Sequence, residues 1–568
     1  MYFTGGVLLL LTFLRCVRCE RVWAEYHEQT HFQSSPSTRN DNVADHIQKP
    51  RPIFTPELST FIQEVVDNEP IPGLSLAVVH GENRTAEFKI WGIRTEDGDR
   101  MTSDTLFYLA SCSKAFLSAS VGILMDDYAH RRNATPLPSG LSRFDWYTKV
   151  KDILPDDWKL MDEWASEKAT IRDVLSHQSG LPRHEFSYTG NDTPFTVVRR
   201  MRYLRPAFEL RERYHYNNQM YMLGSYVVSK YSGMTYMDFV KRRIWEPLNM
   251  SSTTLYESEA SRHGKLTQAW TWRDRRIPIW MHDEQTPLNA GPGGIMSNTI
   301  DMIPVDKRAA RPEFSFTGYG MGWQRLSYQG HEIVMHAGGI PGFSTWVAFL
   351  PSDNLGFVAL ANADGKNEQE LTIIYRIIED YLGLPRKYSP QLTSDSQSKA
   401  AVDKSTTSSD DHALTPPPPL SLEDYAGVYV NLGYPNMTLC APTSDSPQCK
   451  QALEAFSHFE DVKHSQTLYA IVPSIWISHA RLRHVKETTF DLSGTYLFPH
   501  GYGKNETAFE TWELGDSGAV AEFVLEELLG GGSKVVGVGL RGFVGETTML
   551  ERAGGTVEET ADVYFTKA

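Results

Sequence analysis

The stretch Leu106-Phe-Tyr-Leu-Ala-Ser111-Cys-Ser-Lys114-Ala-Phe116 joins an apolar run to a helical pattern, and we expect the rest of the chain to be organised around it. Downstream of it, side chains that can form one helix face recur at Leu117, Val121, Leu124 and Tyr128. Ser111 is therefore predicted at or just inside a helix N-terminus, where unpaired backbone N–H groups and the helix dipole favour negative charge. Lys114 follows three residues later and lies on the same helical face as the serine.

Ser111 to Lys114 form a Ser-x-x-Lys pattern, which places a nucleophile beside a basic nitrogen and is typical of one class of serine hydrolases. The pattern is short, and Ser396-Gln-Ser-Lys399 matches it as well, within a polar tract. Only the first copy lies between an apolar run and a helical pattern. We therefore predict Ser111 as a nucleophile and Lys114 as its base.

The length of 568 residues predicts two domains joined by a linker, because one hydrophobic core seldom serves so long a chain. Hydrophobic residues make up 41% of the chain, enough for extensive cores. The net charge of −15 argues against nucleic acid or an anionic membrane as a partner, since both bind basic surfaces. The sequence contains no Gly-rich phosphate loop, and it gives no information on the oligomeric state.

Residues 1–19 contain an apolar run from Gly5 to Leu14 that is too short to span a bilayer. The run is typical of a signal-peptide core with cleavage before Glu20, and a signal-anchor is the alternative. Sequons of the form N-x-Ser/Thr also indicate the secretory pathway. They lie at Asn83, Asn133, Asn191, Asn249, Asn436 and Asn505. We predict a secreted glycoprotein without a stable membrane span.

Three cysteines remain if Cys16 and Cys19 are removed with the signal peptide. Cys440 and Cys449 bracket a short polar loop, and we expect them to pair in an oxidising compartment. Cys112 lies next to the predicted nucleophile. A packed core thiol is the favoured interpretation there, because free cysteine behaves mostly as a small buried hydrophobe.

Composition divides the chain into five segments. After the signal peptide, residues 20–52 are polar and predicted to be flexible. His27-Glu-Gln-Thr-His31 in this segment fits a zinc-protease pattern, but it lacks the buried helix and third ligand that zinc needs, so no metal is predicted. Residues 53–386 form the first domain and residues 387–420 a disordered Ser/Thr/Pro linker. Residues 421–568 carry short alternating segments that predict an all-β module.

Strand and helix patterns within residues 53–386 predict an α+β fold. Thr55-Pro-Glu-Leu58 begins a helix, and strand patterns follow at residues 73–80 and 85–91. The opposite end of the domain has strand patterns at 332–337, 343–350 and 356–361 and a helix at 368–382. Because the region between them reads as helices and loops, we expect an antiparallel sheet built from both ends, flanked by the terminal helices, with an inserted helical subdomain. The cleft between the two parts is the expected site.

Two further elements accompany Ser111. Tyr216-Asn-Asn218 fits a Tyr-x-Asn element and precedes an apolar helical face, although Tyr429-Val-Asn431 in the β module matches by chance. His336-Ala-Gly338-Gly339 lies in a predicted strand, where the alternative is a turn or bulge with an exposed histidine.

In this order, Ser-x-x-Lys, Tyr-x-Asn and His-x-Gly make the chain resemble the serine β-lactamase-like family. This family includes class C β-lactamases, D-Ala-D-Ala carboxypeptidases, D-aminopeptidases and related esterases. The resemblance covers about residues 53–384 and extends more weakly to residues 422–568, as in secreted eukaryotic members with a lipocalin-like domain. Connecting stretches that also match are Thr170-Ile-Arg-Asp-Val-Leu-Ser-His177-Gln-Ser179-Gly180-Leu-Pro and Ala290-Gly-Pro-Gly-Gly294. It implies a β-lactamase/transpeptidase-like fold followed by a lipocalin-like barrel.

The resemblance also implies roles for the site residues. Ser111 would attack an ester or amide carbonyl, with Lys114 and Tyr216 sharing the general-base work. Asn218 would contact the acyl side chain, and the backbone N–H groups of Ser111 and Gly339 would bind the oxyanion. His336 and Gly338 would line the substrate site. No cofactor is implied. His177 has the form of a base, but we expect a structural role because Lys114 and Tyr216 already fill that function.

The chain departs from the family in two places. β-Lactamases usually carry lysine where this chain has His336, and histidine is mostly neutral at neutral pH, so peptidase or esterase action is favoured over β-lactam hydrolysis. We expect a carboxylate substrate to bind better as the pH falls through the titration of His336. The stretch between Asp301 and Tyr319 is also much shorter than in the family, so either one cleft wall is missing or a coding segment is absent.

We therefore predict a secreted serine hydrolase that forms an acyl-enzyme on Ser111 and cleaves an ester, amide or D-peptide bond in a small molecule or peptide. Two alternatives stay open. One is a non-catalytic binding protein on the same fold, and the other is an acyltransferase to a small-molecule alcohol. The substrate itself is not encoded in a transferable pattern.

Overall fold

The computed structural model describes residues 52–82, 84–262, 264–303, 318–387, 416–512, 518–542 and 548–568. The predicted signal peptide, the His27–His31 pair, the Asn83 sequon, the Ser396–Lys399 copy and most of the linker lie outside these residues. So does most of the short stretch before Tyr319. No helix within the described residues is long and apolar enough to cross a membrane. In the same part of the chain, no group of three or more His, Cys, Asp or Glu side chains could hold a metal ion.

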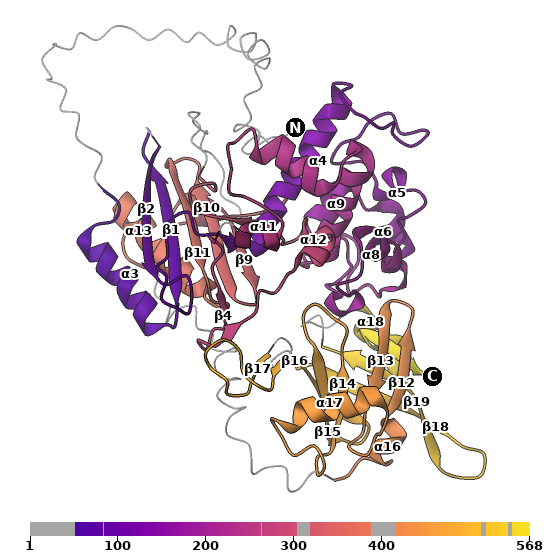
Figure 1. Ribbon diagram of the computed structural model, residues 1–568. Coiled ribbons are helices and arrows are strands. Elements are labelled where there is room, and N and C mark those ends of the chain that lie inside the picture. Colours follow the sequence, from indigo (N-terminus) through magenta and orange to yellow (C-terminus); the bar gives the residue numbers. More distant parts are fainter. Residues whose placement is uncertain are drawn as a thin grey trace, which may run out of the picture.

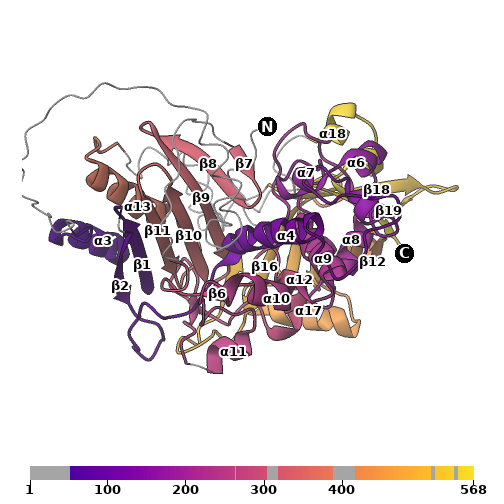
Figure 2. The same cartoon turned by 90° about the horizontal axis from the view of Figure 1, so that it is seen from above.

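The N-terminal domain is built on a seven-stranded antiparallel sheet in the order β2-β1-β11-β10-β9-β8-β7 (Figure 2). The strands are β1 (Gly73–His80), β2 (Thr85–Gly92), β7 (Gly318–Gly320), β8 (Trp323–Tyr328), β9 (His331–Ile340), β10 (Phe343–Leu350) and β11 (Leu355–Ala361). β1 pairs with β11, with Leu74 opposite Ala361, so the two ends of the domain meet in the middle of the sheet. The predicted α+β fold with a sheet made from both ends is confirmed, and β7 and β8 extend it.

Two terminal helices cover one face of this sheet, α3 (Pro56–Asn68) and α13 (Asn367–Leu382) (Figures 1 and 2). α3 begins as predicted, because the Thr55 side chain accepts a hydrogen bond from the backbone N–H of Leu58 and a proline occupies the first helical turn. Both helices turn an apolar stripe inward. Together with the sheet they bury Leu58, Ile62, Val66, Ile373, Ile374, Ile377 and Ile378.

The inserted helical subdomain packs on the opposite side, with α4 lying against the sheet (Figure 2). Its α-helices are α4 (Ser113–Ala129), α5 (Val150–Ile153), α6 (Glu163–Lys168), α7 (Ile171–Leu175), α8 (Pro194–Arg200), α9 (Asn218–Ser232), α10 (Tyr236–Val240), α11 (Glu257–Arg262) and α12 (Thr286–Asn289). Shorter turns are η1 (Ala110–Cys112), η2 (Glu185–Ser187), η3 (Met201–Tyr203), η4 (Lys241–Trp245) and η5 (Asp283–Gln285). α4 is buried on nearly all faces, as expected for a helix at the centre of a domain.

Two small sheets join the subdomain to the main sheet. β3 (Phe107–Tyr108) pairs with β6 (Met296–Ser297), and β4 (Ala269–Trp270) pairs with β5 (Arg276–Ile277). The apolar run predicted to precede Ser111 is thus a two-residue strand. Leu109 joins it to η1, so the serine lies where the sheet side of the domain meets the helices.

The C-terminal domain is a nine-stranded antiparallel sheet that nearly closes on itself. Its strands are β12 (Gly427–Asn431), β13 (Tyr434–Leu439), β14 (Thr467–Ile471), β15 (His479–Lys486), β16 (Thr489–Phe498), β17 (Phe509–Trp512), β18 (Val520–Glu527), β19 (Ser533–Arg541) and β20 (Val563–Lys567). Its helices are α16 (Leu422–Tyr425), α17 (Pro447–Ser457), α18 (Met549–Ala553) and α19 (Val557–Thr560). A single bridge between Cys440 and Tyr469 links the two ends, β13 and β14. The predicted all-β module is confirmed as a near-barrel.

Aromatic rings fill the inside of this near-barrel. Tyr425 lies 4.9 Å from Phe523 and 5.3 Å from Phe490, measured between ring centroids, and these residues belong to one buried cluster. A barrel packed in this way supports its surface loops rigidly. Because its interior is filled by side chains, the domain has its surface available for function.

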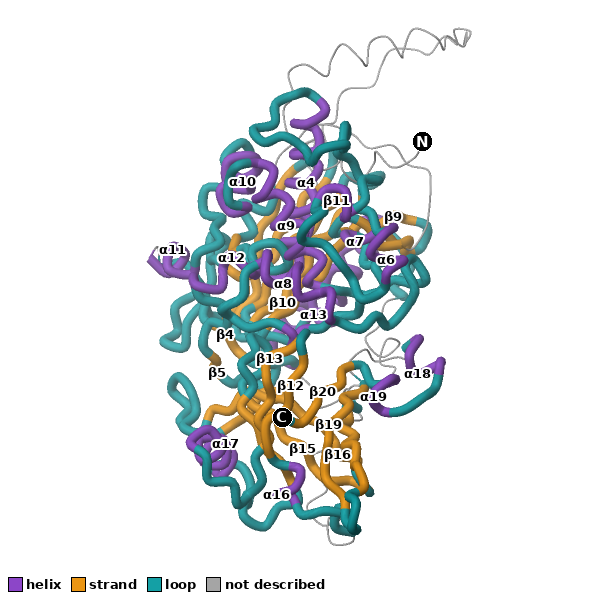
Figure 3. The backbone as a smooth tube through the Cα atoms, turned by 90° about the vertical axis from the view of Figure 1, so that its right-hand side faces the viewer, coloured by secondary structure: helices purple, strands orange, loops and turns teal. Residues whose placement is uncertain are grey.

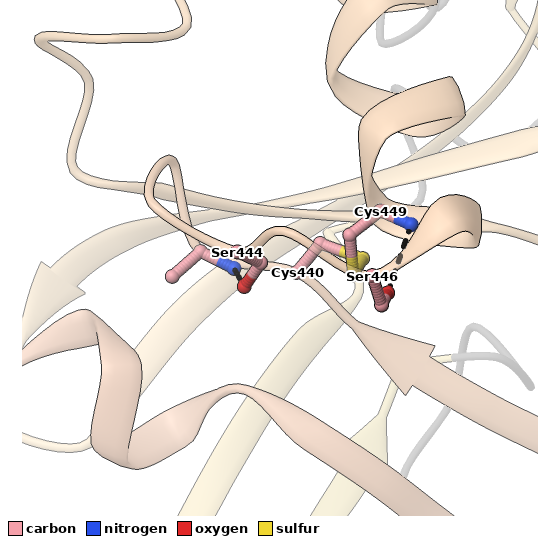
Figure 4. The surroundings of a disulfide bond; sticks show 5 residues. Cys440, Ser444, Ser446 and Cys449 are labelled. Atoms are coloured by element: carbon pink, nitrogen blue, oxygen red, sulfur yellow. Dashed lines mark hydrogen bonds between the residues drawn. A yellow bond between two sulfur atoms is a disulfide. The ribbon is translucent and has the colours of Figure 1, made fainter.

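Cys440 and Cys449 form a disulfide bond at the edge of β13 (Figure 4). The loop between them is ordered by side-chain hydrogen bonds. Ser444 accepts from the backbone N–H of Ala441 at 2.9 Å, and Ser446 accepts from that of Cys449 at 3.2 Å as it caps α17. The bond lies next to the bridge that closes the sheet. Cys112 is free and buried, as the sequence predicted.

The C-terminal domain packs below the helical subdomain (Figures 1 and 3). The guanidinium of Arg205 donates to the backbone oxygens of Ala561 at 2.9 Å and Glu558 at 2.6 Å. The backbone N–H of Met549 donates to the oxygen of Ala207 at 2.7 Å. These hydrogen bonds, which all end on backbone oxygens, hold the two domains together.

Among the sequons within the described residues, the asparagine is exposed at Asn191, Asn249, Asn436 and Asn505. Asn133 is half-buried, and its side-chain amide donates to the backbone oxygen of Thr135 at 2.9 Å. Glycan attachment needs a surface side chain. Four of the predicted positions meet that requirement directly, and their glycosylation stays a prediction.

Candidate active site

Ser111 lies on η1, two residues before α4 begins at Ser113. The residue before it, Ala110, has a φ of 45°, a left-handed conformation that costs a non-glycine residue of the order of 1–3 kcal/mol. Surrounding structure holds this turn, since the backbone N–H of Leu109 donates to the oxygen of Ile295 at 2.8 Å. The strained turn directs the chain from the end of β3 at Tyr108 into α4 at Ser113. Ser111 is the half-exposed member of an otherwise buried turn.

Lys114 is fully buried beneath the serine. Its Nζ lies 3.1 Å from Ser111 Oγ, and it donates at 2.7 Å to both Asn218 Oδ1 and the backbone oxygen of Pro292. Burial holds the pKa of Lys114 well below its ordinary value, with the positive charge of Arg183 acting in the same direction. A lysine with a lowered pKa has neutral amine available to accept a proton.

Tyr216 contacts the same oxygen from the other side. Its hydroxyl donates to Ser111 Oγ at 2.6 Å, and Lys114 Nζ lies 4.7 Å from the centroid of its ring. Burial raises the pKa of Tyr216 above its ordinary value, so the side chain is a neutral phenol. The structure therefore brings together Ser111, Lys114 and Tyr216, which are remote from each other in the sequence.

Asn217 fixes the position of Tyr216. Its side-chain oxygen caps α9 by accepting from the backbone N–H of Gln219 at 2.8 Å, and its amide donates to the backbone oxygens of Leu181 and Pro182. Its own backbone N–H donates to Nδ1 of His177 at 3.0 Å. The start of α9 is thus held to the loop after α7, which leaves Tyr216 little freedom.

His177 packs among aromatic rings rather than against the serine. Its ring centroid lies 4.5 Å from that of Tyr216, 4.8 Å from that of Tyr319 and 5.2 Å from that of Tyr221. Burial keeps its pKa well below the ordinary value, so it is neutral. These contacts agree with the structural role expected for His177.

Strand β9 forms the other wall of the site, beside η1. The thiol of Cys112 donates to the backbone oxygen of His336 at 3.2 Å, and Thr345 Oγ1, from the neighbouring strand β10, donates to the oxygen of Leu109 at 3.0 Å. At Gly338, an added Cβ would lie within 3.0 Å of Thr345 Oγ1 and of the Leu109 oxygen, closer than real Cβ atoms approach. Only glycine lets β9 run this close to the turn that carries Ser111.

Gly339 follows in the same strand and pairs with Ser344 of β10. An added Cβ there would lie 3.4 Å from the side-chain oxygen of Asn367, which is ordinary contact. The amide of Asn367 in turn donates to the backbone oxygen of Gly338 at 3.0 Å. The strand segment that is expected to supply the oxyanion donor is therefore held from α13 as well as from β10.

His336 is buried in β9, and its Nε2 lies 3.0 Å from the hydroxyl of Tyr319. Its Nδ1 lies 2.5 Å from the backbone oxygen of Ala337. The exposed turn or bulge considered from the sequence is therefore wrong, because the residue lies in a regular strand whose inner face is covered. Both ring nitrogens have partners within the protein.

A family model described as Beta-lactamase matches residues 58–381. The chain belongs to the β-lactamase family. The match covers the sheet, the helical subdomain and the three motifs. Members of this family are serine hydrolases, and the resemblance inferred from the motifs is confirmed.

Curated proteins similar to this chain include a hydrolase and a penicillin-binding protein. The unguisins hydrolase ungD' of Aspergillus campestris (strain IBT 28561) is 30% identical over 431 residues, which cover 67% of this chain and 77% of that protein. Penicillin-binding protein 4* of Bacillus subtilis (strain 168) is 26% identical over 337 residues, covering 53% of this chain and 70% of that protein. The first alignment is longer than the family match.

Solved structures also align with this chain. The octameric penicillin-binding protein homologue from Pyrococcus abyssi is 16% identical and aligns over 90% of this chain and 99% of that chain, with a TM-score of 0.48. The class C β-lactamase from Rhodobacter sphaeroides is 21% identical and aligns over 58% of this chain and 100% of that chain, with a TM-score of 0.46.

The geometry of His336 corrects one expectation about this β-lactamase family member. Burial, with Lys114 as a smaller cause, lowers the pKa of His336 to about 3. The expected gain in carboxylate binding as the pH falls through this titration therefore lies below the usual assay range. We expect the KM of a D-Ala-D-Ala peptide to change by less than about twofold between about pH 5 and pH 8, where an unperturbed histidine would titrate.

Steady-state kinetics at several pH values would check this, with an uncharged ester as the matched substrate. If the KM of the peptide alone fell about tenfold as the solution became more acidic, the neutral state assigned to His336 would be wrong.

Three neighbours of the predicted residues were missed from the sequence. Glu185 accepts a hydrogen bond from the amide of Asn218 at 2.9 Å, Tyr319 contacts His336, and the oxygen of Pro292 accepts from Lys114. The amide of Asn218 is thus engaged by Lys114 and Glu185, and a substrate contact, the expected role, would be made in addition to these. Pro292 lies within the quoted Ala290–Gly294 stretch, whereas a single glutamate or tyrosine in a loop carries no periodic signal.

Proposed function

We propose that this chain cleaves an amide or ester bond through an acyl-enzyme on Ser111, with amides as the preferred substrates. The observation that carries the proposal is the pair of contacts at one hydroxyl, Tyr216 at 2.6 Å and the buried Lys114 at 3.1 Å. A serine hydroxyl is a weak nucleophile until an adjacent base removes its proton, and Lys114 is placed to do so. A relative of this chain is named a hydrolase, which supports the reaction type.

Acylation follows from this arrangement. The neutral amine of Lys114 accepts the proton of the Ser111 hydroxyl as Oγ bonds to the substrate carbonyl carbon. The carbonyl π electrons move to its oxygen, and the backbone N–H groups of Ser111 and Gly339 are expected to bind the resulting oxyanion. Each such donor is typically worth about 10²–10³ in rate. The strained turn at Ala110 and the strand β9 place these two backbone segments beside each other.

A proton donor beside Ser111 suits this site to amide substrates. When the tetrahedral intermediate collapses, the C–N bond breaks and the departing nitrogen needs a proton. The neutral phenol of Tyr216 can give that proton and regain one from the Lys114 ammonium. Water then attacks the acyl-serine and loses a proton to Lys114. The bond between the acyl carbon and Oγ breaks, Lys114 returns the proton to Oγ, and a carboxylic acid is released. The net change is addition of one water across the amide bond.

The preference for substrates without a carboxylate rests on His336 in strand β9. His336 is neutral and already bonded to Tyr319, so this position offers no fixed positive charge. The lysine that β-lactamases usually carry there would supply one. We infer that the substrate needs no carboxylate at this subsite, which favours peptide or other amide bonds over β-lactams and free C-terminal D-alanine.

The proposal is tested with a fluorophosphonate probe, which reacts with an activated serine. We expect the purified full-length chain to be labelled and Ser111→Ala to remain unlabelled, while Ser113→Ala serves as the neighbouring control. Ser113 lies one position beyond Cys112, and its hydroxyl accepts from the backbone N–H of Ile295 rather than facing the base. Unlabelled wild-type protein that is folded would indicate a binding protein on the same fold.

We also propose that the protein is secreted and glycosylated. The apolar N-terminal run and the exposed sequons support this, with Asn191, Asn249, Asn436 and Asn505 at the surface. Expression in a eukaryotic host should yield protein in the medium whose mass falls on treatment with an N-glycosidase. Protein that stays in the cells at its unmodified mass would contradict the proposal.

A further inference from the structure

A buried carboxylate lies two hydrogen bonds from the catalytic lysine. Glu185, at the start of η2, accepts from the amide of Asn218 at 2.9 Å, and Asn218 Oδ1 accepts from Lys114 at 2.7 Å. The same Glu185 oxygen accepts from Nε of Arg183 at 3.2 Å. Asn218 can hold Lys114 beneath the serine only while its amide keeps one orientation. Glu185 fixes that orientation, because it accepts from the nitrogen end of the amide.

The other oxygen of Glu185 is reached from the C-terminal domain. It accepts a hydrogen bond from the hydroxyl of Tyr188, a fully buried side chain. Nε1 of Trp476, in the loop between β14 and β15, donates to the hydroxyl oxygen of Tyr188 at 3.2 Å. A continuous path of hydrogen bonds therefore runs from the near-barrel to the lysine.

A second contact holds the same loop. Nδ1 of His184 lies 2.6 Å from the hydroxyl of Tyr434, at the start of β13. His184 and Glu185 are consecutive. Tyr434 contacts the first directly and Trp476 reaches the second through Tyr188, so the C-terminal domain holds the segment that supports Asn218 at two points. Other contacts between the domains lie elsewhere on the interface, among them the hydrogen bond from the Arg205 guanidinium to the backbone oxygen of Ala561 and the ion pair of Arg552 with Glu212.

We propose that Glu185 is a positioning residue for Lys114 and acts through Asn218. The C-terminal domain is then part of the catalytic site, because Trp476 holds Tyr188 and Tyr188 holds Glu185. The inference rests on the proposed serine hydrolase function, since Lys114 must act as a base for its position to affect turnover. It assigns the near-barrel a role in catalysis that its packed interior does not suggest.

The charge of Glu185 gives this role a distinct signature. Burial lowers the pKa of Lys114, whereas the negative charge of Glu185 acts to raise it. The titratable or charged groups that face Lys114 are Ser111, Cys112, His177, Arg183, Glu185, Tyr216, Tyr221 and His336. Among them, Glu185 is linked to Lys114 by two hydrogen bonds through the side-chain amide of Asn218.

The first test is the variant Glu185→Gln in the full-length protein, with p-nitrophenyl butyrate as the probe substrate. Glutamine still offers an oxygen to the amide of Asn218 but removes the negative charge. Turnover requires neutral Lys114, and loss of the carboxylate makes its proton easier to remove. We therefore expect the acidic limb of the kcat/KM profile to move to lower pH. A limb that coincides with that of the wild type would overturn the proposal.

The second test concerns the link between the domains. Trp476→Phe keeps an aromatic side chain, although a smaller one, and removes the N–H that contacts Tyr188; we expect kcat to fall about 10- to 100-fold with little change in KM. Trp280→Phe is the matched control. Its ring lies 6.5 Å from that of Trp476, and within the described residues its Nε1 has no hydrogen-bond partner. Its kcat should equal that of the wild type.

The double variant Tyr188→Phe/Trp476→Phe decides whether the path is continuous. Both changes cut one path, so we expect the pair to lose no more activity than Tyr188→Phe alone. Losses that multiply, or Trp476→Phe with wild-type kcat, would overturn the link. Should Trp476→Phe fail to fold, the shift in Glu185→Gln and the loss in Tyr188→Phe carry the test. A wild-type protein without Ser111-dependent turnover would instead contradict the proposed function.

Discussion

Lys114→Met is expected to lower kcat/KM by about 10²–10⁴, the range over which positioned acids and bases act. Methionine has a similar length and fills the buried space, but it offers no nitrogen to accept the proton of Ser111. The oxygens of Asn218 and Pro292 lose their donor, which costs about 1–3 kcal/mol for each buried polar group left unpaired. Relief from burying an amine offsets part of that loss, so the variant should fold.

The measurement is the rate of p-nitrophenyl butyrate hydrolysis over a range of pH, together with the melting temperature. Lys241→Met, at an exposed position on η4, serves as the control for removing a lysine and should keep wild-type activity. The acidic limb of the profile should disappear in Lys114→Met, because the group that titrates there is gone. If Lys114→Met kept more than about a tenth of the wild-type activity, Tyr216 rather than Lys114 would be the base.

The position of the catalytic cluster could be predicted from the sequence because each motif adjoins a regular element. Ser111 follows an apolar run and starts a helical pattern, Tyr216 precedes a capped helix, and the glycines after His336 lie in a strand. These local patterns set backbone direction. No single pattern could show which side chains meet. The order of all three matched a known family, and that order predicted the meeting of Ser111, Lys114 and Tyr216.

The chemical state of the site could not be predicted in the same way. His336 was expected to titrate near neutrality, yet burial, with the charge of Lys114 as a smaller cause, lowers its pKa to about 3. Tyr319, which contacts His336, lies on β7 at the edge of the sheet, and β7 and β8 were not recognised as strands. A residue's pKa follows from neighbours brought together by the fold, so residue type alone gave the wrong range.

Residues that act through hydrogen bonds between loops also escaped prediction. Glu185 lies in an irregular segment, and its partners Asn218 and Tyr188 reach it from different elements. The all-β module was predicted from alternating patterns, but its contact through Trp476 was not. Domain interfaces use isolated side chains at loop ends, which have no spacing that a sequence pattern can show.

Gly338→Ala is expected to disturb both stability and catalysis, because the new Cβ has no free space. It would lie within 3.0 Å of Thr345 Oγ1 and of the backbone oxygen of Leu109. A flexible side chain could move, but the Leu109 oxygen belongs to the strained turn that carries Ser111. β9 must therefore shift away from η1. Such overpacking costs about 1–3 kcal/mol of unfolding free energy.

The same shift should lower kcat more than KM. Gly339 follows directly and is expected to supply an oxyanion donor, and loss of one such donor typically costs about 10²–10³ in kcat. Gly356→Ala on β11 is the matched control, since its added Cβ would meet its nearest neighbour, the oxygen of Ala348, at an ordinary 3.8 Å. Urea denaturation and steady-state kinetics on both variants separate the two effects.

The combination with Thr345→Ala distinguishes the two clashes at Gly338. If the contact with Thr345 Oγ1 were the cause, removing that hydroxyl would restore activity to Gly338→Ala. We expect no rescue, because the Leu109 oxygen remains in place and Thr345 also donates a hydrogen bond to it at 3.0 Å. Restored turnover, or a Gly338→Ala variant as active as Gly356→Ala, would show that β9 does not need to lie this close to Ser111.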